Sequence, residues 1–98
     1  MTKEEQIEHI RLFTDRMKGL LESKGNDYSN DDRLSVFKLT AVLCHTTPEK
    51  VVLDKIITKV MRLSNLLSKG QPNHESIDDT IIDLVNYAVL LDQIIKEK

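Results

Sequence analysis

Three acidic residues recur at every fourth position near the C-terminal end of the chain: Glu75, Asp79 and Asp83. Residues four apart lie side by side on one face of a helix, and like charges there repel each other. A row of carboxylates on a helix can instead share a hard divalent cation. Mg²⁺ takes oxygen ligands and retains waters for substrate phosphates. The three residues are therefore candidate Mg²⁺ ligands and candidate catalytic residues.

A basic stripe with matching spacing precedes the acidic one. Lys55, Lys59 and Arg62 follow each other at intervals of four and three residues. A short break at residues 70–73, which contains Gly and Pro, separates the two segments, so they should fold back on each other as antiparallel helices. Counting outward from the break gives the expected neighbours: Arg62 with Asp79, Lys59 with Asp83, and Lys55 with Asn86.

Two facing stripes of opposite charge have two interpretations. They form either an interhelical ladder of ion pairs or a site for metal and phosphate. In the second case Lys59 and Arg62 would bind phosphate, Arg as a bidentate fork and Lys as a point charge. Further candidates for nucleotide contacts lie elsewhere in the chain: Arg33 and Lys38 as phosphate ligands, Tyr28 for stacking on a base, and Asn86 for a base edge or ribose hydroxyl, or else for a helix-packing hydrogen bond.

Four helices account for nearly the whole chain, over about residues 3–24, 31–45, 48–69 and 73–95. Thr2 and Glu5 form a capping-box pattern at the first helix, and Asn30 is the expected cap of the second. Thr47 followed by Pro48 is a typical helix start for the third. The apolar positions expected inside the third helix are Val52, Ile56, Val60, Leu63 and Leu67. Alternation typical of strands is absent.

The pattern predicts an all-α protein, a four-helix bundle formed by a single domain over residues 1–98. A chain of 98 residues can build only a modest core, so we also expect a homo-oligomer. The net charge of −2 argues against general DNA or RNA binding. No apolar run approaches the ~20 residues of a membrane span. A single cysteine, Cys44, and a charged N-terminus without a signal peptide suggest a cytoplasmic protein.

Read as a string, the chain resembles a phage-type MazG-like, nucleotide-modification-associated group of small proteins. The resemblance covers about residues 20–92 and rests on the following segments: Lys24-Gly25-Asn26-Asp27-Tyr28, Asp31 to Lys38, Thr47-Pro48-Glu49, Lys59 with Arg62-Leu63, and Glu75-Ser76-Ile77 leading to Asp79, Asp83 and Asn86-Tyr87. That group is tied to the all-α nucleoside triphosphate pyrophosphohydrolases. The resemblance implies a helical protein that acts on nucleotides, with Mg²⁺ held by acids of the kind at Glu75, Asp79 and Asp83.

One feature departs from the MazG-type pattern. Those enzymes take metal ligands from an EExxE motif and a later ExxD. Glu75 to Asp78 has the ExxD spacing, but the facing helix carries the basic stripe, and the EExxE at Glu4, Glu5 and Glu8 lies in the first helix. Three functions therefore stay open: a Mg²⁺-dependent pyrophosphohydrolase of (d)NTPs, a non-catalytic sponge that sequesters a linear or cyclic nucleotide signal in phage counter-defence, and a structural or interaction module.

Overall fold

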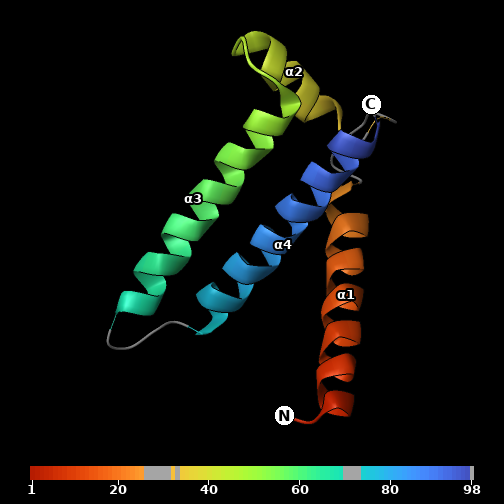
Figure 1. The fold of residues 1–98 in the computed structure, drawn as a ribbon, viewed down its shortest axis with the longest axis vertical. Coiled ribbons are helices and arrows are strands. Elements are labelled where there is room, and N and C mark those ends of the chain that lie inside the picture. The colour runs from red at the N-terminus through yellow and green to blue at the C-terminus, as the bar shows by residue number, and fades with distance from the viewer. Residues whose placement is uncertain (26–31, 33, 70–73, 98) are drawn as a thin grey trace. The chain divides into compact units, whose positions relative to one another are not determined.

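The computed structural model describes residues 1–25, 32, 34–69 and 74–97, with the backbone alone for residues 24, 25, 74 and 75. Within these ranges the chain forms four α-helices and no strand (Figure 1): α1 (Lys3–Gly25), α2 (Ser35–Leu43), α3 (Pro48–Ser68) and α4 (His74–Glu97). The predicted all-α class and the four helices are confirmed. None of these helices combines the length and apolar character needed to cross a membrane.

The chain divides into two compact units, residues 1–33 and 34–98. The first unit contains α1, which begins with the predicted capping box. The Glu5 amide donates to Thr2 Oγ1 at 3.1 Å, and the Thr2 amide donates to Glu5 Oε1 at 3.4 Å. These reciprocal bonds satisfy two amide groups that the helix itself leaves without acceptors. A single domain over residues 1–98, with α1 packed into a bundle, stays a prediction.

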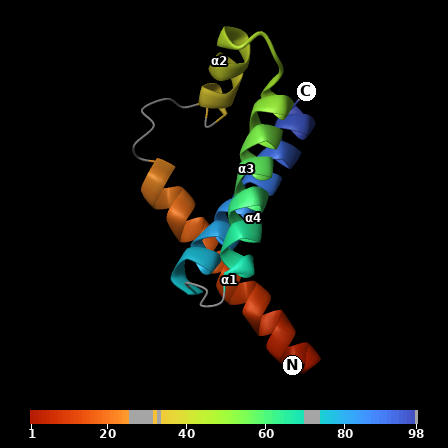
Figure 2. The ribbon, with the colours of Figure 1, turned by 90° about the vertical axis from the view of Figure 1, so that its left-hand side faces the viewer.

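The second unit is an antiparallel hairpin of α3 and α4, with α2 packed near the N-terminal end of α3 (Figure 2). Its core forms where the three helices meet. Leu34, Val52 and Ile94 are buried there. The side chains packed against these three are Phe37, Ile56, Tyr87, Leu90 and Leu91. Apolar burial of this kind is the main stabilising term for the unit, and it fixes α3 and α4 side by side.

The starts of α2 and α3 show how well cap signals predict a boundary. Thr47 caps α3 as predicted: its Oγ1 accepts from the Lys50 amide at 3.3 Å, and proline occupies the first turn. The prediction that the second helix begins near Asp31 was wrong, because Asp32 is not helical and α2 begins at Ser35. Leu34, just before α2, is only 7% exposed and belongs to the core with Val52 and Ile94. The predicted cap Asn30 lies outside the described residues.

A second correction concerns the interior face of α3. Val52 is fully buried and Ile56 packs against the core, as predicted, but Val60 is 46% exposed and Leu67 is 62% exposed. The predicted set mixes two neighbouring faces of one helix. Positions in register with Val52 continue at intervals of four and three residues through Lys59. Val60 lies one position later, which is about 100° further around the helix axis.

Candidate functional site

The polar contacts between α3 and α4 begin with an ion pair that the stripe spacing predicts. Lys59 Nζ lies 3.1 Å from Asp83 Oδ2. The two side chains are 26% and 30% exposed, so the pair is half-buried at the joint between the helices. The register counted outward from the break in the sequence is thereby confirmed at this position.

Arg62 lies one helical turn after Lys59 and contacts α4 as well, at a residue that the sequence analysis missed. Its Nε donates to Thr80 Oγ1 at 3.2 Å, whereas Asp79 was the predicted neighbour. Thr80 is 2% exposed, and its hydroxyl donates in turn to the Ser76 carbonyl at 2.6 Å. A hydroxyl carries no charge signal in a sequence. Its one clue is the position of a threonine within an otherwise apolar helical stretch.

We call Lys59, Arg62, Thr80 and Asp83 the polar seam. Its charges are the Lys59–Asp83 ion pair and, one turn along α3, the guanidinium of Arg62. The hydroxyl of Thr80 orients this guanidinium. Arg62 is exposed overall, and its described hydrogen bond uses Nε. A guanidinium carries five N–H donors in a rigid plane. Fixing Nε therefore fixes the direction of the terminal Nη donors, which are the groups that bind phosphate or carboxylate in a fork.

The predicted Mg²⁺ site needs three carboxylates, and the described side chains do not supply it. Asp83 is paired with Lys59, and no group of three His, Cys, Asp or Glu residues that could hold a metal occurs among the described residues. The side chain of Glu75 lies outside the described residues, so a Mg²⁺ site formed by Glu75, Asp79 and Asp83 stays a prediction. The described part of the seam has the chemistry of an anion site with its own counter-ion.

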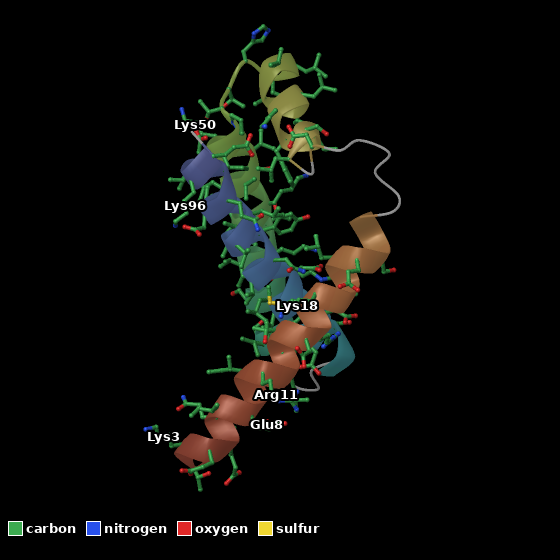
Figure 3. The ribbon with its side chains drawn as sticks, turned by 90° about the vertical axis from the view of Figure 1, so that its right-hand side faces the viewer. Lys3, Glu8, Arg11, Lys18, Lys50 and Lys96 are labelled. Carbon is green, nitrogen blue, oxygen red and sulfur yellow. The ribbon has the colours of Figure 1, made fainter. Side chains whose placement is uncertain are left out.

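The N-terminal EExxE belongs to the unit that contains α1. Glu8 and Arg11 lie close together on α1 (Figure 3), and Glu8 accepts two hydrogen bonds from Arg11. Arg11 also pairs with Asp15 at 3.1 Å. The hydrogen bond from Arg11 lowers the pKa of Glu8, and Glu8 raises the pKa of Arg11 in return. The motif acid Glu8 therefore takes part in a local network on the α1 surface.

Lys38, a predicted phosphate ligand, lies at the other end of the hairpin. It forms an ion pair with Glu97 and lines an open groove of about 350 Å³. The remaining lining residues come from the start of α3 and the end of α4: Thr47, Pro48, Glu49 and Ile94. Pro48 and Lys59 are eleven residues apart on α3, which is about 16 Å along the helix. The structure therefore does not bring Lys38 to the polar seam.

The remaining predicted contacts divide into two groups. Tyr28 and Arg33 lie outside the described residues. Asn86 is described and partly buried on α4, one turn beyond Asp83, but no contact with Lys55 is described. Tyr87, next in the chain, packs against the core. The seam itself is thus the one place where the structure brings predicted site residues of both stripes into contact among the described residues.

The polar seam lies within a segment that matches a known protein family. Residues 45–95, just over half of the chain, match the family model described as Nucleotide modification associated domain 1. The matched segment contains all of α3 and nearly all of α4. Neither a curated protein nor a solved structure gives a significant match.

Proposed function

The chain belongs to the family described as nucleotide modification associated domain 1, and we propose that it binds a nucleotide by its phosphates at the polar seam. The observation that supports the proposal most directly is the placement of Arg62. Its Nε is held by the buried hydroxyl of Thr80, while the residue as a whole is exposed. An arginine oriented in advance loses less side-chain entropy when it binds a phosphate fork.

Lys59 would provide the second cation. It is engaged with Asp83, and an ion pair whose side chains are 26% and 30% exposed is worth about 1 kcal/mol or less. A charge-assisted hydrogen bond to phosphate contributes about 1.5–3 kcal/mol. A phosphate can therefore share Lys59 with Asp83 or replace Asp83 as its partner. Asp83 then tunes the affinity, since its negative charge opposes an anion at the same position.

The simplest form of this function is binding without turnover. A protein of this kind would hold a linear or cyclic nucleotide intact, as a sponge in phage counter-defence would. The charges of the polar seam support this form. Lys59 and Arg62 are two cations that can bind an anion, and the carboxylate described in the seam, Asp83, is already paired with Lys59. Such a site can hold and stabilise a phosphate, which is all that binding without turnover requires.

A Mg²⁺-dependent pyrophosphohydrolase of the MazG-like type is the second candidate. Asp79 and Asp83 lie one turn apart on α4, and Glu75 precedes them by the same interval. In that reaction water forms a bond to the α-phosphorus of a (d)NTP, the bond to the bridging oxygen breaks, and pyrophosphate leaves. Mg²⁺ would supply charge neutralisation at the phosphates. Either activity would act on the cytoplasmic nucleotide pool.

A single experiment separates these functions. The purified protein is incubated with linear and cyclic nucleotides, with and without Mg²⁺, and mass spectrometry is applied to the free pool and to material released by heat denaturation. Recovery of an intact nucleotide from the protein supports binding. Mg²⁺-dependent formation of monophosphate and pyrophosphate supports the hydrolase. Absence of both would overturn nucleotide handling and leave the seam a structural ladder.

Variants then assign the binding to the seam. Arg62→Ala should weaken nucleotide binding by roughly tenfold to a hundredfold, the cost of about one charge-assisted fork, and Arg62→Lys should recover only part of it. Lys96→Ala is the matched control, because Lys96 also pairs with an aspartate, Asp92, but on the outer surface of α4. Equal losses in Arg62→Ala and Lys96→Ala, measured by isothermal titration calorimetry, would place the nucleotide elsewhere.

A further inference from the structure

α3 carries a second apolar row that α4 does not cover. Leu53, Ile57, Val60, Ser64 and Leu67 follow each other at intervals of four, three, four and three residues, and we call them the open seam. The four apolar members are 46–62% exposed, and Met61 beside them is 60% exposed. Single exposed apolar residues are ordinary on protein surfaces, but a contiguous row along one helix marks an interaction surface.

The spacing of the open seam is that of a coiled-coil heptad, in which the first and fourth positions face a partner helix. α3 has this pattern twice. The row that contains Val52, Ile56, Lys59 and Leu63 lies one position earlier and accounts for the contacts described above with the core and with Asp83. The open seam has the same periodicity without a charged member. Its pattern therefore indicates a further helix as partner, rather than a flat surface or a small ligand.

We propose that the open seam packs against the open seam of a second copy of this chain, with the two α3 helices antiparallel. Identical surfaces related by a twofold axis satisfy each other without any further component. In an antiparallel coiled coil, the first position of a heptad on one helix packs against the fourth position of a heptad on the other. Ile57 of one copy would therefore face Val60 of the other. Leu53 would face Ser64 of the second copy in the next layer.

Charge at the ends of the seam favours the antiparallel direction. Lys50 lies at the N-terminal end of α3, one turn before Leu53 (Figure 3). The pairing would place its stem over Leu67 of the second copy and its ammonium group near the end of that α3. The last turn of α3 has no basic residue of its own, and the C-cap residue Lys69 lies two positions beyond Leu67, so the carbonyl groups of that turn can accept this cation. A parallel pair would instead place the two Lys50 residues side by side.

The open seam is also large enough for a stable dimer interface. The five exposed apolar side chains present on the order of 500 Å² per copy, and homodimer interfaces are about 65% apolar. With its polar rim, the buried surface would reach roughly 800 Å² per partner, the usual size of a stable interface. The inference concerns a face of α3 other than the polar seam and does not depend on the proposed nucleotide function.

Sedimentation velocity of the full chain tests the proposal. Wild type should associate at micromolar concentration, and Ile57→Glu or Val60→Glu should raise the dissociation constant by roughly a hundredfold, as loss of a central apolar contact does. Val89→Glu is the matched control, an exposed apolar residue on α4 that is 41% exposed. Circular dichroism checks that every variant keeps its helices. A monomeric wild type, or association that survives Val60→Glu, would overturn the proposal.

Disulfide trapping tests the geometry in a Cys44→Ser background. A mixture of the Ile57→Cys and Val60→Cys chains should form mixed disulfides under mild oxidation, because these positions face each other across the axis. The Leu67→Cys chain should not cross-link with itself, because the two substituted side chains of an antiparallel pair would lie at opposite ends of the pair. Efficient cross-linking of Leu67→Cys to itself, without the mixed product, would show a parallel pair and contradict the proposed arrangement.

Discussion

α1 and the α3–α4 hairpin are both long helical elements with apolar and charged faces, but their described polar contacts differ in kind. On α1, Arg11 pairs with Glu8 and Asp15, three and four residues away along the chain. In the hairpin, Arg62 reaches Thr80, 18 residues away, and Lys59 reaches Asp83 on the facing helix. Local pairs follow from helix geometry alone, whereas the pairs of the hairpin exist because a core aligns two helices.

The largest effect should come from the most deeply buried apolar side chains of the hairpin. Ile82 is 1% exposed. Ile82→Ala should lower the free energy of unfolding of the α2–α4 unit by about 3 kcal/mol, the sum of lost burial and a residual cavity. Urea denaturation followed by circular dichroism measures the change. Since small domains have only about 5–15 kcal/mol of stability, a loss of this size should be visible as a clear shift of the midpoint.

Ile10→Ala on α1 is the matched control for Ile82→Ala. Ile10 is 56% exposed, so its removal should change the free energy of unfolding by less than about 1 kcal/mol. If both variants cost the same, α1 contributes to the cooperative core as strongly as the hairpin does, and the contrast between the two regions would not hold.

A smaller difference should separate two lysine–aspartate pairs that the structure describes in the hairpin, Lys59–Asp83 and Lys96–Asp92. A double-mutant cycle with Lys59→Met and Asp83→Asn should give a coupling energy of about 1 kcal/mol, because the pair is half-buried. The Lys96–Asp92 pair is 72% and 59% exposed and joins residues of the same helical face, so its cycle should give about 0.3–0.5 kcal/mol. High salt should weaken the exposed pair more. Equal couplings would mean that burial between α3 and α4 adds nothing to the ion pair.

The smallest effect should be the pH response of α1. The hydrogen bond from Arg11 lowers the pKa of Glu8 below its value in the unfolded chain. The pairing therefore stabilises the helix fully above the unfolded pKa, and this stabilisation is lost as the pH falls through the folded pKa. An NMR titration of the Glu8 carboxyl should show its pKa rising in Arg11→Gln. A pKa of Glu8 that does not change in this variant would show that the pair does not persist in solution.

Much of the fold could be predicted from the sequence, and the reason is local. The capping box of Thr2 and Glu5 and the start of α3 at Thr47 depend on residues within one helical turn. The start of α2 at Ser35 could not be predicted in this way. Leu34 precedes it without a side-chain cap bond, and this residue is buried in a core shared with Val52 and Ile94, which are distant in the sequence.

For the candidate site, the sequence predicted which turns of α3 and α4 lie side by side better than it predicted which residues contact each other. Lys59 and Asp83 are brought together as their spacing predicts. The partner of Arg62 is Thr80 rather than Asp79, because the rotation of α4 turns one residue rather than its neighbour toward α3. Spacing fixes which turns of two helices are level. It does not fix the rotation of each helix about its own axis, on which the identity of each contact depends.

The sequence by itself determined that this chain is helical, where α1 and α3 begin, and which turns of α3 and α4 lie at the same level. These properties depend on interactions between residues three or four apart, which any helix places together. Only the tertiary structure decided that Thr80 is buried against Arg62 and that α4 covers Val52 but not Val60. α3 has two adjacent apolar rows of the same period, and only the packing of a second helix selects which one is buried.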